Sequence, residues 1–346
     1  MGTLVTIEVV RPGPDAEAAI GRAFGWFHEI EARCTRFDPR SELMQLTAHA
    51  GQPVSASVIL FEAVRFALML AEESGGAFDP TVGHRMEARG FNREHRTGEI
   101  VRTAIVAADD VTYGDVELDP DRRTITLRRP LTLDLGAVAK GLAVDAAARE
   151  LEHFQDFAID AGGDLYLGGS NAQGAPWCVG VRHPRRDGEV IDSLLVSNQA
   201  VCTSGDYERR VFEELAQNGA RREAVSGPSG GARRTLCAFE ELAQNGVRRE
   251  AVSGPPGGSR RTLCASNEHH ILDPRVTSNR LGCSPGAVAS ATVVASGAML
   301  ADGLATAAFV LGPEAGIQLL NRLGVDGLIV TPDLERFETG GLRYGF

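Results

Sequence analysis

The chain has 346 residues, of which 43% are hydrophobic and 23% are charged, and its formal net charge is −11. These values are typical of a soluble globular protein with one or two domains and exclude a largely disordered chain. Because an acidic surface repels a phosphate backbone, nucleic acid is not an expected partner, although local basic groups can line a pocket for a phosphorylated small molecule.

The sequence contains neither a predicted membrane span nor a predicted export signal. No segment is apolar over the length of a membrane-spanning helix, and the first residues lack a basic region followed by an apolar one. As numbered, the chain is expected in the cytoplasm; a periplasmic or membrane-associated location stays open if the sequence has been trimmed. The six cysteines form no Cys-x-x-Cys pair, which favours reduced, mostly buried thiols over zinc ligands or disulfides.

The N-terminal part predicts a strand, two helices and further short strands. Apolar and polar residues alternate over 5–9, which predicts a half-buried strand. Apolar residues at three-and-four spacing predict helices over about 15–33 and 57–73, and we interpret both as scaffold. Short β-like runs follow at 124–127 and 131–133.

A third helix is predicted to start close to Gly136, and Gly141 on its apolar face would let another backbone approach closely. The C-terminal third alternates strands and helices, which are predicted at 291–295, 297–311, 314–323 and 327–330. This mixture indicates an α+β or α/β protein with a mixed β-sheet.

A tandem duplication is the clearest feature of the chain's organisation. Residues 212–238 reappear as residues 239–265 with only three differences. Each copy combines a Ser-Gly-Pro turn cluster and Arg-Arg pairs with few bulky apolar residues, so it can form a β-hairpin but no core of its own. We expect 212–265 to be an exposed, mobile insertion in a single domain spanning 1–346; a protein-docking surface is the alternative.

Asp302 and Thr306 lie four residues apart within the helix predicted at 297–311. This spacing places both side chains on one helix face, where a carboxylate and a hydroxyl together suit a hard cation such as Mg²⁺. The alternative is an aspartate that faces water and a threonine that bonds back to a helix carbonyl. The pair alone does not decide between the two interpretations.

Residues 134–141 run from an acid at the end of a predicted strand, through a glycine turn, into a helix. Unpaired N–H groups at such a helix start can bind phosphate oxygens, and Lys140 adds a positive charge. The alternative is that Asp134 caps the turn and that the glycines serve packing.

Further polar motifs stand at 160–164, 203–209 and 269–274. The first has two acids around a glycine pair, which suits either a tight turn beside a ligand or a plain hairpin. The second is a polar run that follows an apolar strand-like segment. In the third, His270 precedes an Asp-Pro turn and can serve as a general base, a metal ligand or a cap for that turn.

Short motifs along nearly the whole chain, taken in sequence order, resemble those of the family of FAD:protein FMN transferases, historically called the ApbE or thiamine-biosynthesis-lipoprotein family. The motifs lie at 1–3, 37–43, 75–81, 134–141, 160–164, 203–209, 270–274 and 301–306. The resemblance implies a single α+β unit with a mixed β-sheet and flanking helices, which binds FAD in a cleft. It also implies a flavin transferase that moves FMN from FAD, through a phosphoester, to a Thr or Ser of a target protein and releases AMP.

Carried over position by position, the resemblance implies a Mg²⁺ site made by the Asp302 carboxylate, the Thr306 hydroxyl and the backbone carbonyl of Ala137. FAD phosphate and water would complete the coordination. The positions that match the family's surroundings of the flavin nucleotide are Met1, Phe37, Ala77, Phe78, Asp79, Asp134, Lys140 and His270. Asp134 is expected near the adenine or ribose, and Phe37 against a ring.

The implied reaction has physical support. Splitting a pyrophosphate requires neutralisation of its negative charge, which Mg²⁺ and Lys140 can provide. The incoming hydroxyl needs a proton acceptor, and His270 or a neighbouring acid is the candidate, so His270 and Asp302 are the predicted catalytic residues. The expected partner is an acceptor protein with an Asp-x-x-Ala-Thr-like motif. Hydrolysis of FAD to FMN and AMP, and flavin binding without catalysis, are the alternatives.

The chain departs from the family pattern at three places. It begins at the Met-Gly-Thr motif itself, where many members carry preceding residues, and this leaves the ligand role of Met1 open. The duplicated segment stands before His270, where the family has a short hairpin, and it must loop out if His270 is to keep its place. Residues 302–306 themselves match the Asp-x-x-Ala-Thr pattern, but burial in a helix is expected to protect Thr306 from modification.

Overall fold

The structure is a computed structural model that describes residues 2–94, 97–103, 105, 107–108, 110–207, 270–276 and 285–345. The chain divides into two compact units, and all described residues belong to the first, Met1–Val211 with Cys264–Phe346. The predictions for Met1 and for the duplicated segment 212–265 lie outside the described residues and stay predictions.

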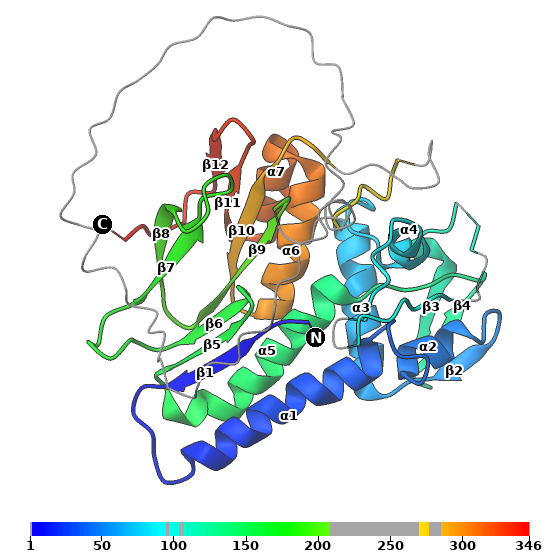
Figure 1. Cartoon of the computed structure of the whole chain (residues 1–346), viewed down its shortest axis with the longest axis horizontal. Coiled ribbons are helices and arrows are strands. Elements are labelled where there is room, and N and C mark those ends of the chain that lie inside the picture. Colours follow the sequence, from blue (N-terminus) through cyan, green and yellow to red (C-terminus); the bar gives the residue numbers. More distant parts are fainter. Residues whose placement is uncertain are drawn as a thin grey trace, which may run out of the picture. The chain divides into compact units, whose positions relative to one another are not determined.

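The first unit is built on a seven-stranded sheet in the order β1-β5-β6-β9-β10-β11-β12 (Figure 1). Its strands are β1 (Val5–Val9), β5 (Phe157–Ala161), β6 (Leu165–Gly168), β9 (Gln199–Gly205), β10 (Ser290–Ala295), β11 (Asp326–Val330) and β12 (Arg336–Glu338). Neighbouring strands of this sheet pair antiparallel at every described ladder. The α+β class is confirmed, but the mixed sheet that we predicted is wrong.

The reason for the antiparallel sheet lies in its connections. β5 and β6 form a hairpin, as the glycine pair of 160–164 allowed. Between β10 and β11 the chain passes through two consecutive helices, α6 (Ala298–Leu311) and α7 (Pro313–Leu323). Because the second helix returns the chain along the first, β11 enters the sheet beside β10 and runs in the opposite direction.

Helices cover one face of this sheet, and a β-hairpin covers the other (Figure 1). The helical side carries α6 and α7 together with α1 (Ala16–Cys34) and α5 (Gly136–Leu151). The opposite side carries β7 (Trp177–Arg182) and β8 (Val190–Val196), which pair with each other. Successive side chains of a strand point to opposite faces, so Val293 joins the core under the helices while Val294 joins the core under the hairpin.

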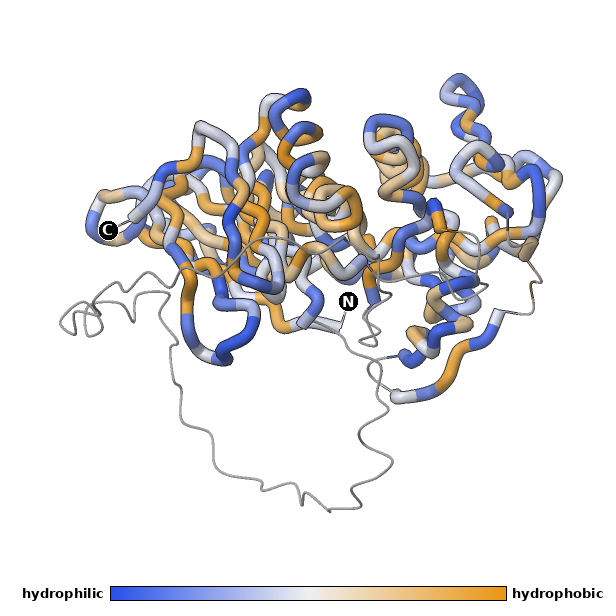
Figure 2. Tube along the Cα trace, turned by 90° about the horizontal axis from the view of Figure 1, so that it is seen from above, coloured by the Kyte–Doolittle hydropathy of each residue, from blue (hydrophilic) through white to orange (hydrophobic). Residues whose placement is uncertain are grey.

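A three-stranded sheet adjoins this layer structure, in the order β2-β4-β3. The elements of this region are β2 (Pro53–Ser55), β3 (Val116–Asp119), β4 (Thr124–Leu127), α2 (Glu42–Thr47), α3 (Val58–Glu73), α4 (Gly83–Ala88) and the short helices η1 (Pro80–Val82) and η2 (Tyr113–Asp115). Ser57 caps α3, because its hydroxyl accepts from the backbone N–H of Leu60 at 3.2 Å. Figure 2 shows apolar residues where elements pack together and polar residues along many connecting turns.

The predicted helices and the strands at 5–9, 124–127, 291–295 and 327–330 are confirmed with small shifts at their ends. The β-like run at 131–133 is not a strand. Thr132 in this run is buried, and its carbonyl accepts from the backbone N–H of Gly83 at 3.1 Å, so a loop contact takes the place of a strand ladder. Within the described ranges, no helix combines the length and the apolar character needed to cross a bilayer.

Candidate functional site

Five side chains from four separate parts of the sequence form a polar cluster between α5, α6, β9 and the β5–β6 turn: Lys140, Asp164, Ser204, Asp302 and Thr306. The Lys140 Nζ lies 2.5 Å from Asp164 Oδ2, and the Thr306 Oγ1 lies 3.0 Å from Ser204 Oγ. Asp302 is only 6% exposed, so the interpretation in which this aspartate faces water is wrong. Ser204 and Asp164 belong to motifs that the sequence analysis singled out without a role.

The electrostatics of the polar cluster keep Lys140 charged. Burial by itself lowers the pKa of Lys140, but the carboxylates of Asp302 and Asp164 outweigh burial and raise that pKa. The same surroundings raise the pKa of Cys202, chiefly through burial and then through the nearby carboxylates. Cys202 is therefore a protonated thiol, and it donates to the carbonyl of Ala298 at 3.6 Å. Of the three described cysteines, Cys34 and Cys202 are buried, as predicted for most of the cysteines, whereas Cys178 is exposed.

The donor atoms in this region suit a hard divalent cation. A Cβ atom placed on Gly303 would lie 3.7 Å from the carbonyl oxygen of Ala137, so this carbonyl faces the residue next to Asp302. Carboxylate, hydroxyl and carbonyl oxygens are the ligands that Mg²⁺ prefers. In the part of the chain that the structure describes, no three His, Cys, Asp or Glu side chains gather as a metal site. The residues present fit a cation site whose donors are a carboxylate, a hydroxyl and a carbonyl oxygen.

A second group, the ring cluster, consists of Arg36, Phe37, Phe91, Asp134 and His270. Arg36 pairs with Asp134, with 2.7 Å between Nε and Oδ2, and its guanidinium carbon lies 4.3 Å from the centre of the Phe37 ring. Arg36 also donates to the carbonyl of Phe91, whose ring meets the His270 ring edge-on with 6.5 Å between centroids. Three predicted site residues, Phe37, Asp134 and His270, are therefore brought together.

The two clusters meet at the start of α5. Asp134 Oδ1 accepts from the backbone N–H of Gly136 at 2.8 Å, which confirms the interpretation that Asp134 caps the turn. Ala137 and Lys140 follow in the first two turns of the same helix. The sequence analysis missed Arg36 and Phe91; the position of Arg36 next to Phe37 is the only signal that pointed to either.

Ala77, Phe78 and Asp79 are all buried. Asp79 accepts from the backbone N–H groups of Thr81 and Tyr113, at 2.8 and 3.0 Å, and burial raises its pKa in spite of these bonds. The carbonyl of the following Pro80 accepts from the backbone N–H of Asp134 at 2.7 Å. This segment therefore shapes the backbone beside Asp134, and its side chains point into the protein.

The first described residues lie against the β5–β6 turn. Gly162 in this turn has a φ of +68°, and a Cβ atom on it would overlap the side chain of Thr3. A glycine is required there both for the backbone conformation and for the close approach. The predicted motifs at 1–3 and 160–164 are thus neighbours.

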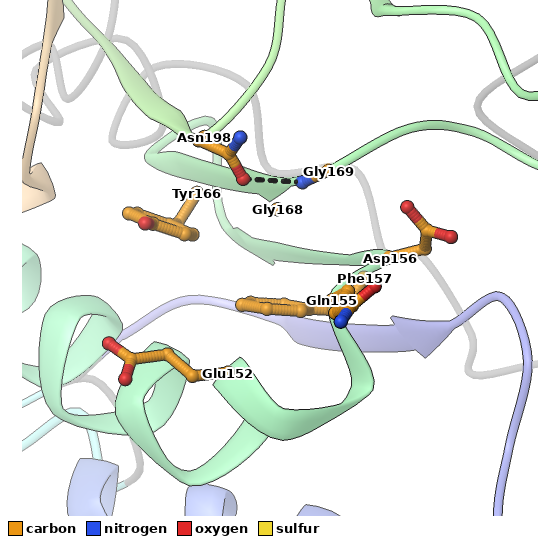
Figure 3. Close-up of a pocket in the computed structure, with 8 residues that line it drawn as sticks. All are labelled: Glu152, Gln155, Asp156, Phe157, Tyr166, Gly168, Gly169 and Asn198. Carbon is orange, nitrogen blue, oxygen red and sulfur yellow. Dashed lines mark hydrogen bonds between the residues drawn. The ribbon is translucent and has the colours of Figure 1, made fainter.

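A concave pocket of about 370 Å³ lies at the opposite end of the β5–β6 hairpin (Figure 3). The rings of Phe157 and Tyr166 stack in its wall with 5.8 Å between centroids, and Glu152 of η3 (Glu152–Phe154) lies beside them. Asn198 on its rim accepts from the backbone N–H of Gly169 at 2.7 Å. None of the predicted site residues lines this pocket.

Comparison with known proteins identifies the fold. The model of the ApbE family matches residues 1–232 and 251–329, and a relative from Treponema pallidum is 30% identical over 96% of this chain and 83% of its own length. This chain belongs to the ApbE family. The match omits residues 233–250 within the duplicated segment, which is where this ApbE-family chain departs from the pattern of the family.

The T. pallidum relative carries the name FAD:protein FMN transferase, and so does one from Vibrio cholerae that is 26% identical over 96% of this chain and 86% of its own length. The crystal structure of the ApbE protein from Thermotoga maritima matches with a TM-score of 0.71 at 26% identity, and the match covers 98% of this chain and 94% of that one. The antiparallel sheet and its helical layer are therefore those of an ApbE-family protein.

Proposed function

We propose that this chain is a magnesium-dependent FAD:protein FMN transferase, which moves FMN from FAD to a Thr or Ser hydroxyl of a target protein and releases AMP. The names of its relatives support the reaction. The observation in the chain itself that carries the proposal is the polar cluster, where a half-buried lysine and two buried acids meet a hydroxyl pair. Such buried, mutually perturbing charges concentrate at functional sites.

The charge of the polar cluster favours a cation over a bare pyrophosphate. Lys140 supplies one positive charge while Asp164 and Asp302 supply two negative charges, so one negative charge remains in excess. Asp302, Thr306 and the carbonyl of Ala137 would hold Mg²⁺. When bound there, Mg²⁺ neutralises the charge of the pyrophosphate and polarises its phosphorus–oxygen bonds.

Lys140 then has a role that differs from direct contact with phosphate. Its ammonium is already 2.5 Å from Asp164 and is attracted by Asp302. It therefore holds the carboxylates of Asp164 and Asp302 together at the proposed metal site by charge attraction.

The ring cluster is the proposed surface for the nucleotide. Phe37 is half-buried under the Arg36 guanidinium, and Asp134 fixes Arg36 in that position, so this pair presents a flat, partly exposed surface suited to a ring. The His270 ring meets the Phe91 ring edge-on, and His270 is the proposed acceptor of the proton from the incoming hydroxyl.

The proposal is tested by incubating the protein with FAD and Mg²⁺, with and without a peptide that carries Asp-x-x-Ala-Thr. Covalent FMN on the peptide, detected by mass spectrometry, supports transfer, and the matched peptide with Val in place of Thr should stay unmodified. AMP and free FMN without peptide would identify a FAD pyrophosphatase instead. Bound but unchanged FAD would identify a flavin-binding protein, and chelation of Mg²⁺ with EDTA should abolish turnover.

A further inference from the structure

The N-terminus of α6 is capped by a residue of another helix. Asp145 on α5 accepts from the backbone N–H of Ala298 at 2.6 Å through Oδ1 and from that of Met299 at 2.9 Å through Oδ2. The two helices lie side by side (Figure 1), and a Cβ atom on Gly141 would overlap the backbone of Ala298. One carboxylate of α5 thus binds the first turn of α6 where the helices are in closest contact.

α6 has no cap of its own. The residue at its cap position is Gly297, which has no side chain to bond, and the first turn of α6 contains no acidic residue. Helix starts usually obtain such bonds from a Ser, Thr, Asn or Asp at the cap position. A Cβ atom on Gly297 would lie 3.1 Å from Asp145 Oδ2, so the glycine leaves room for a carboxylate that arrives from α5.

The capped turn lies directly before the proposed metal ligands. Ala298 precedes Asp302 by one helical turn, and on α5 Asp145 follows Gly141 by one turn. The carbonyl of Ala137 comes from α5, whereas Asp302 and Thr306 come from α6. The relative position of the two helices therefore decides whether these three oxygen donors converge.

We propose that Asp145 is a positioning residue, which locks α6 against α5 and so sets the distance between the Ala137 carbonyl and the Asp302 and Thr306 side chains. This inference rests on the proposed function, because it assigns the three donors to one metal. It differs from a purely stabilising cap, which would strengthen α6 without controlling its place beside α5.

The two roles are separated by moving the cap from α5 to α6. Asp145→Ala removes the tie and the cap together. The double variant Asp145→Ala with Gly297→Ser returns a cap from α6 itself, since the extended backbone at 297 (φ −146°, ψ 151°) is that of an N-cap and the removed carboxylate leaves room for a side chain. It does not restore the bond between the helices.

The readout is binding of Mn²⁺ in place of Mg²⁺, followed by electron paramagnetic resonance, together with thermal unfolding of each variant. Asp145→Ala is expected to weaken Mn²⁺ binding by about 10- to 100-fold, as loss of an outer partner of a metal site does. The double variant should regain thermal stability but not affinity. Asp145→Asn, which keeps one acceptor oxygen, should fall between wild type and Asp145→Ala.

The matched control is Asp156→Asn. Asp156 also accepts from a backbone N–H, that of Ser170 at 2.8 Å, but it lies at the end of the β5–β6 hairpin opposite to the turn at 160–164. It should leave Mn²⁺ binding unchanged. Two results would overturn the positioning role alone, if wild type binds Mn²⁺ and turns over FAD. One is a folded Asp145→Ala variant that binds Mn²⁺ as tightly as wild type does. The other is a double variant in which Gly297→Ser restores the affinity for Mn²⁺. Wild type that does neither would overturn the proposed function as well.

Discussion

The β5–β6 hairpin has two unlike ends. At the turn, 160–164, Asp164 is 1% exposed and pairs with Lys140, and the turn packs against Thr3. At the opposite end the pocket of Figure 3 is lined by two acids: Glu152 is exposed, and the buried Asp156 pairs with Arg11, whose side chain is 74% exposed. The turn end thus holds a lysine between two buried acids, whereas the pocket end holds one exposed acid and one buried acid whose partner Arg11 reaches into the solvent.

This difference indicates which property marks the candidate site. Burial of charged groups costs free energy, so a protein retains them where they are paired or used. A surface concavity has no such cost, since irregular loops leave concavities wherever they meet. The buried charges at the turn therefore carry more information about function than the volume at the other end, and variants at both ends test this conclusion.

The largest effect is expected from Asp302→Ala at the turn end. Loss of this proposed ligand should lower kcat/KM for FAD by at least about 100-fold, because misplacement of the reacting groups by even 1 Å costs that much. The fold should survive, since Lys140 keeps its partner Asp164. Turnover is measured by AMP release and folding by circular dichroism. Magnesium-dependent turnover equal to that of wild type would disprove the metal assignment.

Lys140→Met should have the largest effect on stability. It leaves Asp164 and Asp302 buried without their cation, and removal of one partner from a buried ion pair costs about 3–5 kcal/mol of unfolding free energy. The measurement is urea unfolding at neutral pH. The control is Arg11→Met at the pocket end, whose side chain is 74% exposed and pairs with Asp156, and it should cost far less. Equal losses would remove the distinction between the two ends.

The secondary structure around the site could be predicted, whereas its contacts could not. The alternating strand and helix patterns of the C-terminal third predicted α6 and thereby the shared face of Asp302 and Thr306. In contrast, the pairing of Lys140 with Asp164, and of Arg36 with Asp134 across 98 residues of sequence, follows from tertiary packing that local periodicity does not encode.

The order and direction of the strands could not be predicted for the same reason. Alternation identifies a strand and its buried face, but the neighbour of a strand depends on how its connections cross the sheet. A pattern of strands and helices predicted a mixed sheet, and the return through α6 and α7 made it antiparallel. The resemblance to a family supplied the candidate residues that spacing alone left undecided.

Tyr166→Ala tests the pocket end directly. The side chain is half-buried and stacks on Phe157, so its loss should lower the free energy of unfolding by about 1–2 kcal/mol. FAD turnover per folded molecule should equal that of wild type, since the pocket contains none of the proposed site residues. A fall in turnover at saturating FAD, measured at a temperature where the variant is folded, would show that this end takes part in the reaction.

The smallest effect concerns pH at the pocket end. The backbone N–H of Ser170 and then Arg11 lower the pKa of Asp156 below its ordinary value of 3.8. An acid whose pKa is lower in the folded state than in the unfolded state adds stability above the unfolded pKa and loses it as pH falls through the folded pKa. The difference in thermal midpoint between wild type and Asp156→Asn should therefore be constant at neutral pH and shrink below about pH 3.8. A difference that persists at lower pH would mean that Asp156 acts through its shape and not through its charge, and the pocket end would then hold no charge that stability depends on.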